Sequence, residues 1–143
     1  MLLVEDNPDH AELALLTLRE CRPDDRVTVV HDGAEALDYL FARNAHAGRS
    51  VAEAPDVILL DLKLPKVDGL DVLDAIRANA QTKTIPVVVL TSSAEERDVV
   101  ESYRRGANSY VRKPVTFEGL AYCLRQIQIY WTTVNWSNRV EWT

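Results

Sequence analysis

Polar side chains stand at the ends of four short apolar runs in this 143-residue chain. Glu5 and Asp6 follow the first run, Asp61 follows the second, Thr91 the third and Lys113 the fourth. If these runs are parallel strands, their carboxyl ends lie at one edge of a sheet, which is where ligands bind in open α/β folds. Three carboxylates, a hydroxyl and an ammonium would then meet, and together these groups can transfer a phosphoryl group.

Three neighbouring carboxylates require either raised pKa values or a cation among them. At about 4 Å and an effective dielectric of about 20, each like-charge pair costs roughly 4 kcal/mol. Glu5, Asp6 and Asp61 offer only oxygen ligands, which suit Mg²⁺. The backbone carbonyl of Lys63 can complete the shell. The sequence therefore predicts a Mg²⁺ site in preference to a group of solvated acids.

The other polar groups fit roles in phosphoryl transfer. Asp61 is the candidate nucleophile, because a carboxylate can form an acyl phosphate. The Lys113 ammonium and the Thr91 hydroxyl can each bind a phosphoryl oxygen and stabilise its charge. The predicted site thus takes one role from each strand end.

Length and composition predict one cytoplasmic domain. The 47% hydrophobic content suffices for a single core. A net charge of −6 without a basic stripe argues against direct binding of nucleic acid, and no apolar stretch has membrane-spanning length. Cys21 and Cys123 lack Cys-x-x-Cys spacing, no signal peptide is evident, and His10, His31 and His46 share no ligand spacing. We expect reduced thiols and no metal role for these histidines.

Strand and helix signals alternate along the chain. Strands are expected at residues 2–4, 27–31, 57–62, 87–90 and 109–112. Helices are expected from Pro8, from the Asp32 cap to Phe41, over 69–78, between a capping box at Ser93–Glu96 and Gly106, and over 117–131. Strict alternation predicts an α/β fold, a doubly wound five-stranded parallel sheet with five helices on its two faces.

Five ordered motifs carry a resemblance to a known family. They are Val4-Glu5-Asp6-Asn7, Leu59-Leu60-Asp61-Leu62, Leu64-Pro65 with Asp68-Gly69, Leu90-Thr91-Ser92, and Lys113-Pro114. Together they closely resemble the receiver domain of two-component response regulators. The resemblance implies a flavodoxin-like receiver over residues 1–131 with strand order 2-1-3-4-5.

The same resemblance assigns roles to individual residues. It implies Asp61 as phosphoacceptor, Glu5 and Asp6 as metal ligands, Thr91 as the switch hydroxyl, and Lys113 as the phosphate-sensing lysine. It further implies Tyr110 as the aromatic switch and a cis peptide bond before Pro114. Lys63 and Ser93 occupy positions that vary among receivers and tune the lifetime of the acyl phosphate.

Shorter motifs are also similar to the stand-alone regulators that serve bacterial phytochromes. These are Glu-Asp-Asn-Pro with the long loop before Pro55, the run from Ile85 to Ser92, and the Tyr130-Trp131 ending. The similarity implies a sensor histidine kinase as partner, a bacterial phytochrome among the candidates, and a homodimer through the fourth helix, fifth strand and fifth helix. Its face would contain Val99, Tyr103, Tyr110, Leu124, Ile127 and Trp131.

Residues 132–143 follow the predicted domain. Apolar side chains alternate with polar ones there, and Trp136 and Trp142 lie on the apolar side. Because large aromatic side chains favour burial, we expect an extended arm that crosses onto a second copy of the chain. Docking on its own domain, or disorder, is the alternative.

Two classes of function follow. The preferred one is a single-domain signalling protein, not an enzyme beyond Mg²⁺-dependent self-phosphorylation and dephosphorylation. The alternatives are a scaffold receiver that accepts no phosphate, an aspartate-nucleophile phosphatase, and a flavin-binding flavodoxin relative. Lys63 stands where such a phosphatase would carry its acid–base Asp, and Glu5 and Asp6 would repel a flavin phosphate.

Overall fold

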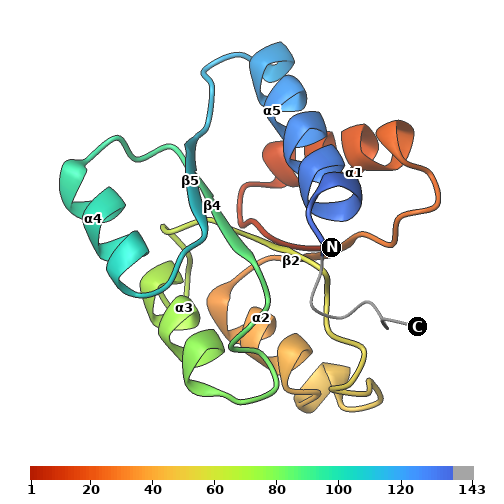
Figure 1. Cartoon of the computed structure of the whole chain (residues 1–143), viewed down its shortest axis with the longest axis vertical. Helices are drawn as coiled ribbons and strands as arrows, with labels where there is room; N and C mark the ends of the chain where they lie inside the picture. The colour runs from red at the N-terminus through yellow and green to blue at the C-terminus, as the bar shows by residue number, and fades with distance from the viewer. Residues whose placement is uncertain (137–143) are drawn as a thin grey trace.

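The computed structural model describes residues 1–136 and contains one parallel sheet between two layers of helices (Figure 1). Its strands are β1 (Leu2–Val4), β2 (Thr28–Val30), β3 (Ile58–Leu60), β4 (Val87–Thr91) and β5 (Ser109–Arg112). Its helices are α1 (Pro8–Cys21), α2 (Gly33–Leu40), α3 (Gly69–Ala78), α4 (Glu96–Arg104) and α5 (Phe117–Ile129). A short 3₁₀ helix, η1 (Asn44–His46), and a π-helical turn, η2 (Tyr130–Val134), complete the described elements. The sheet order β2-β1-β3-β4-β5, with every pair parallel, confirms the predicted doubly wound fold.

Alternate side chains of the central strands face opposite layers of helices. Leu2 and Val4 of β1 pack against α2 and α3, whereas Leu3 packs against α1 and α5. The same alternation holds in β3 and β4, and every residue of these two strands is buried. Because both faces of the sheet are covered, the strands read as continuous apolar runs instead of alternating ones.

Two helix starts confirm the predicted caps. The Asn7 side chain accepts hydrogen bonds from the backbone N–H groups of Asp9 and His10, and Pro8 is the first residue of α1. At α2, the Asp32 carboxylate accepts the Glu35 N–H at 2.7 Å, and the Glu35 carboxylate accepts the His31 N–H. Both caps fix a helix that starts from the sheet edge where the polar strand ends lie.

The start of α4 differs from the prediction. The expected capping box at Ser93–Glu96 is wrong, because Glu95 is the residue before the helix and its side chain makes no capping hydrogen bond. Ser93 Oγ accepts the N–H of Glu95 at 3.3 Å, not that of Glu96, and the Ser93 hydroxyl donates to the Asp98 carboxylate at 2.5 Å. The predicted stop is confirmed: Gly106 has a φ of +103°, and its N–H donates to the Tyr103 carbonyl.

The end of the chain is also more helical than predicted. The π-helical turn η2 continues α5 through Val134, where the Asn135 N–H donates to the Tyr130 carbonyl. The expected arm therefore cannot be extended from residue 132. The remainder of the expected arm, Trp142 included, lies outside the described residues.

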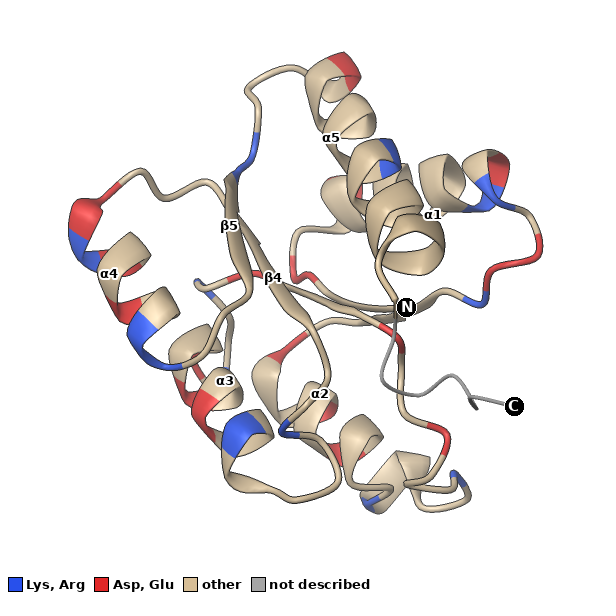
Figure 2. Ribbon diagram, viewed as in Figure 1, with Lys and Arg blue, Asp and Glu red and all other residues tan. Residues whose placement is uncertain are grey.

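Charged side chains on α3 and α4 pair across the gap between these helices. The guanidinium of Arg105, just after α4, lies 3.1 Å from the Asp74 carboxylate and 3.7 Å from the Asp71 carboxylate, both on α3. It also lies 3.4 Å from the Glu101 carboxylate on α4. Figure 2 shows acidic and basic positions interspersed along α3 and α4. Over residues 1–136, no helix combines the length and apolarity needed to cross a bilayer.

Replacement of Gly69 by alanine should destabilise the fold. A Cβ atom there would lie 2.3 Å from the Asp61 carbonyl oxygen and 2.6 Å from Leu62 Cα, so backbone would have to shift. We expect Gly69→Ala to lower the free energy of unfolding in urea by about 1–3 kcal/mol. Gly48→Ala is the control, since nothing lies within 4 Å of its Cβ, and it should change stability by at most about 1 kcal/mol, upward. Equal effects of the two substitutions would contradict this account of the packing.

Candidate phosphoryl-transfer site

The sheet register brings the predicted site residues together. Val4 pairs with Leu60, so Glu5 and Asp61 leave neighbouring strands at the same level, and the Asp61 N–H donates to the Val4 carbonyl at 3.2 Å. On the other side, Thr91 ends β4 and its carbonyl accepts the Lys113 N–H at 2.7 Å. All four strand ends therefore contribute to one edge, as predicted.

Lys113 is a buried ammonium between two buried carboxylates. Its Nζ donates to the Glu5 carboxylate and to Asp61 Oδ2, the latter at 3.0 Å. It also lies 3.1 Å from His10 Nδ1. A buried charge is tolerated when it is paired and hydrogen bonded, and Lys113 has a partner on three sides.

Burial and pairing act in opposite directions on these groups. Burial alone would lower the pKa of Lys113, but the hydrogen bond to Glu5 and the Asp61 charge outweigh it and raise the pKa above its usual value. Burial raises the pKa of Glu5, and the hydrogen bond and charge of Lys113 offset only part of this effect. Lys113 therefore keeps its positive charge, and its ammonium is the cation that lies between the carboxylates of Glu5 and Asp61.

The three acids fit a divalent metal ion. One carboxylate oxygen from each of Glu5, Asp6 and Asp61 lies within 4.8 Å of the others. Glu5 and Asp61 are buried and Asp6 is exposed, so the group opens toward solvent on one side. All three donors are hard oxygens, as Mg²⁺ and Mn²⁺ prefer. The backbone N–H of Lys63 donates to Asp61 Oδ1 at 3.3 Å and orients the carboxylate.

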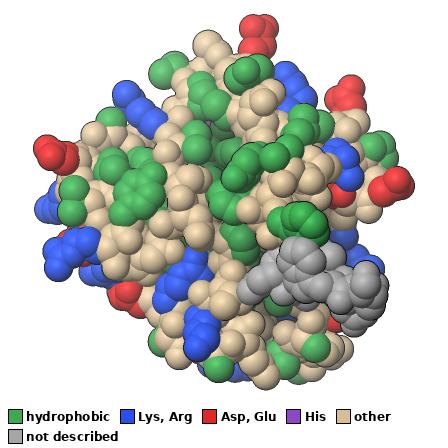
Figure 3. Space-filling view, viewed as in Figure 1, with side chains coloured by type: hydrophobic (Ala, Val, Ile, Leu, Met, Phe, Trp, Pro, Cys, Tyr) green, Lys and Arg blue, Asp and Glu red, His purple; other side chains and the backbone are tan. Residues whose placement is uncertain are grey.

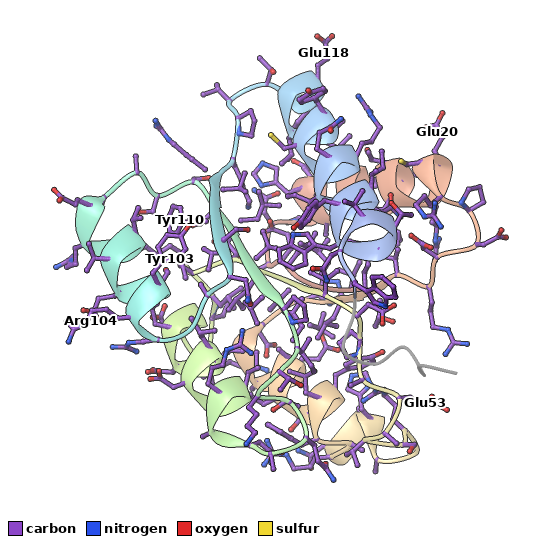
Figure 4. The ribbon with its side chains drawn as sticks, viewed as in Figure 1. Glu20, Glu53, Tyr103, Arg104, Tyr110 and Glu118 are labelled. Atoms are coloured by element: carbon purple, nitrogen blue, oxygen red, sulfur yellow. The ribbon has the colours of Figure 1, made fainter. Side chains whose placement is uncertain are left out.

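Thr91 and Tyr110 lie on the side of the site that faces α4. Thr91 is buried, and its Oγ1 lies 3.4 Å from the Ser93 N–H. The Tyr110 hydroxyl donates to the Ser93 carbonyl at 2.9 Å, and Figure 4 shows this side chain leaving β5 on the same side as Tyr103 of α4. Burial raises the pKa of Tyr110, so its hydroxyl remains a donor at neutral pH.

One geometric expectation is wrong. The peptide bond between Lys113 and Pro114 is trans, not cis. The trans form is the favoured one for most X–Pro bonds. The Lys113 side chain reaches Glu5 and Asp61 with this trans geometry.

Two residues join the site that the sequence analysis did not predict. His10 lies in the first turn of α1, where the helix starts beside Glu5, and its ring contacts Lys113. Asp98 lies in the first turn of α4 and binds Ser93 and Lys63. Both residues lie in the first turn of a helix that follows a strand whose end carries a site residue. That position in the sequence could have indicated that they lie near the site.

The residues of the predicted dimer face differ in their exposure. Tyr103 is 50% exposed, Val99, Tyr110 and Trp131 are partly buried, and Trp136 is 69% exposed. Figure 3 shows apolar side chains gathered over α4, β5 and α5. Leu124 and Ile127, however, are buried against α1 and the sheet, so they support this face from beneath and cannot contact a partner.

Comparison with protein families gives a match over most of the chain. The family model of the response regulator receiver domain matches residues 1–125. Among curated proteins, the chain is 42% identical to the probable methanogenesis regulatory protein FilR2 of Methanothrix harundinacea, over 92% of this chain and 82% of that protein. It is 36% identical to the response regulator Rcp1 of Synechocystis, over 92% and 87%.

Solved structures show the same fold over nearly the whole chain. The phosphorylated cyanobacterial phytochrome response regulator RcpA has a TM-score of 0.89 and 36% identity, and the match covers 96% of each chain. The bacteriophytochrome response regulator RtBRR has a TM-score of 0.75 and 46% identity, covering 98% of this chain and 81% of that one. Rcp1 has been solved with Mn²⁺ bound, at a TM-score of 0.87, 34% identity and coverage of 95% and 96%.

Divalent metal should stabilise the fold through the three acids. A ligand that binds only the folded state adds about 2.7 kcal/mol at a free concentration of about 100 Kd. We expect Mg²⁺ or Mn²⁺ to raise the melting temperature, and Asp6→Asn to remove most of the rise. Asp9→Asn, an exposed acid in the first turn of α1, is the control and should keep it. An equal rise in the parent chain and in Asp6→Asn would contradict the assignment of Asp6 as a ligand.

Proposed function

The chain belongs to the response regulator receiver domain family, and we propose that its Asp61 accepts a phosphoryl group from the phosphohistidine of a sensor histidine kinase. The observation that supports this most directly is the buried Asp61 carboxylate, which lies 3.0 Å from the Lys113 ammonium and within one cluster of three carboxylates with Glu5 and Asp6.

The reaction requires little from the protein beyond position and charge. An Asp61 carboxylate oxygen bonds to phosphorus as the phosphorus–nitrogen bond to the kinase histidine breaks. The electron pair of that bond returns to the imidazole, which takes up a proton. Lys113 stabilises the charge on the phosphoryl oxygens, and the Lys63 N–H holds the carboxylate in place. A bound Mg²⁺ would neutralise further charge on those oxygens.

The added charge would signal through α4 and β5. Thr91 lies at the end of β4, and its hydroxyl could turn toward the phosphoryl group. Such a turn would change the segment at Ser93, where Tyr110 is bound. Output would then consist of altered protein–protein contacts at the face made by α4, β5 and α5.

The proposed kinase is a phytochrome. The support is similarity to three solved response regulators, RcpA, Rcp1 and RtBRR, which are 34–46% identical to this chain. RcpA is named as a phytochrome response regulator and RtBRR as a bacteriophytochrome response regulator. The family match favours signalling over the phosphatase and flavin-binding alternatives. A scaffold receiver without phosphate is disfavoured by the complete set of acid, hydroxyl and ammonium at one edge.

A chemical test separates phosphoacceptor from scaffold. We expect the protein to form an acid-stable, base-labile adduct, one phosphoryl group heavier, when incubated with Mg²⁺ and acetyl phosphate. Mass spectrometry should show no adduct for Asp61→Asn. Asp56→Asn is the matched control, since Asp56 precedes β3 at the other end of the strand, and it should label like the parent. Absence of the adduct in the parent chain would favour the scaffold.

A homodimer is the second part of the proposal. Exposed apolar side chains lie on α4, at Val100 and Tyr103, and at the end of the described chain, at Tyr130, Val134 and Trp136. Exposed large apolar side chains favour burial and are candidates for an interface. A second copy that covers them would use the face of α4, β5 and α5 together with the residues after η2.

Two variants distinguish the contributions to this dimer. A chain that ends after Asn135 keeps η2 and removes Trp136 and Trp142, and light scattering should show it as a monomer. Tyr103→Glu should weaken the dimer through α4, whereas Leu16→Glu, at an exposed apolar position of α1 outside this face, serves as a control for added charge. An unchanged dimer after truncation would contradict the arm exchange, and a monomeric parent would contradict the dimer itself.

A further inference from the structure

Asp98 is a buried carboxylate outside the set of groups that the proposed reaction uses. It lies in the first turn of α4 and is only 5% exposed. Its Oδ2 accepts the Ser93 hydroxyl at 2.5 Å and lies 3.7 Å from the Lys63 ammonium. Acids this deeply buried occur in folded proteins mainly where they are paired, so these two contacts account for its place.

Both partners of Asp98 border the proposed site. Lys63 follows Asp61 by two residues, and its N–H already donates to the Asp61 carboxylate. Ser93 follows Thr91 by two residues, and its carbonyl accepts the Tyr110 hydroxyl. One carboxylate on α4 thus joins the loop after the phosphoacceptor to the loop after the switch hydroxyl.

The charge at the site changes when Asp61 is phosphorylated. With a divalent cation and Lys113 in place, the charges of Glu5, Asp6 and Asp61 are balanced. An aspartyl phosphate carries one more negative charge than the carboxylate that it replaces, and that charge has no counterion within this set. The Lys63 side chain starts two residues after Asp61 and is 67% exposed, with its ammonium 3.7 Å from Asp98, so the phosphoryl group and Asp98 then compete for one ammonium.

We propose that Asp98 is a positioning residue that holds the Lys63 ammonium on α4 until Asp61 is phosphorylated, when Lys63 leaves Asp98 for the phosphoryl oxygens. This inference rests on the proposed function. When Lys63 leaves, the first turn of α4 loses its tie to the loop after β3. Because coupling is reciprocal, the contact with Asp98 also lowers the affinity of the site for a phosphoryl group.

The test measures binding of a phosphoryl mimic, beryllofluoride, by titration calorimetry at saturating Mg²⁺. Asp98→Asn keeps an oxygen for the Ser93 hydroxyl and removes only the charge. Lys63 is then available to the anion without competition, so we expect roughly two- to fivefold tighter binding, the range of a partly exposed ion pair. The gain should shrink in high salt, because an exposed ammonium is screened.

Lys63→Met and a matched acid provide the controls. In the Lys63→Met background, Asp98→Asn should give no gain, because the ammonium that both anions share is absent. Asp74→Asn removes the same charge from an exposed acid that pairs with Arg105, and it should leave binding unchanged. Unchanged or weaker binding in Asp98→Asn would overturn the proposal, as would an equal gain without Lys63.

The Lys63→Met variant by itself and the parent chain provide two further measurements. If Asp98→Asn does not fold, Lys63→Met alone should bind beryllofluoride more weakly than the parent, and equal or tighter binding would overturn the proposal. Failure of the proposed function has a different signature, since the parent chain itself would then bind no beryllofluoride in the presence of Mg²⁺.

Discussion

The Lys113 ammonium, buried between the carboxylates of Glu5 and Asp61, is the interaction on which the site depends. It joins the segment after β5 to the ends of β1 and β3, three positions far apart in the sequence. A buried charge without a partner is costly, so each of these groups requires the other two. The hydrogen bond and charge of Lys113 offset part of the effect of burial on the pKa of Glu5, and Asp6 lies exposed on the open side of the cluster.

Beyond this cluster, hydrogen bonds extend from the site to the surface in one direction. Ser93 receives the Tyr110 hydroxyl on its carbonyl and donates its own hydroxyl to Asp98, so β5, α4 and the loop after β4 meet at one residue. The exposed apolar side chains of α4 lie just beyond. A change in charge at Asp61 therefore has a short physical route to a face that a partner could cover.

Much of the fold could be predicted because local chemistry agrees with tertiary structure. The continuous apolar runs of β3 and β4 indicated strands covered on both faces, and Asn7, Pro8, Asp32 and Gly106 marked helix ends correctly. The failures came where tertiary contacts compete with local preference. The Ser93 hydroxyl donates to Asp98 and does not form the expected capping box with Glu96, and η2 extends α5 past the point where alternation favoured an extended arm.

The sequence by itself determined the chemistry: which strand ends carry acids, a hydroxyl and an ammonium, and in what order, since residue type and spacing are local properties. Only the tertiary structure decided the pairing. The sheet register sets Glu5 beside Asp61, packing of α1 brings His10 to Lys113, and packing of α4 brings Asp98 to Lys63 and Ser93. Burial of Leu124 and Ile127 was likewise decided by α1. These contacts join residues from separate elements, and no local pattern encodes which side chain of one helix will reach another strand's end.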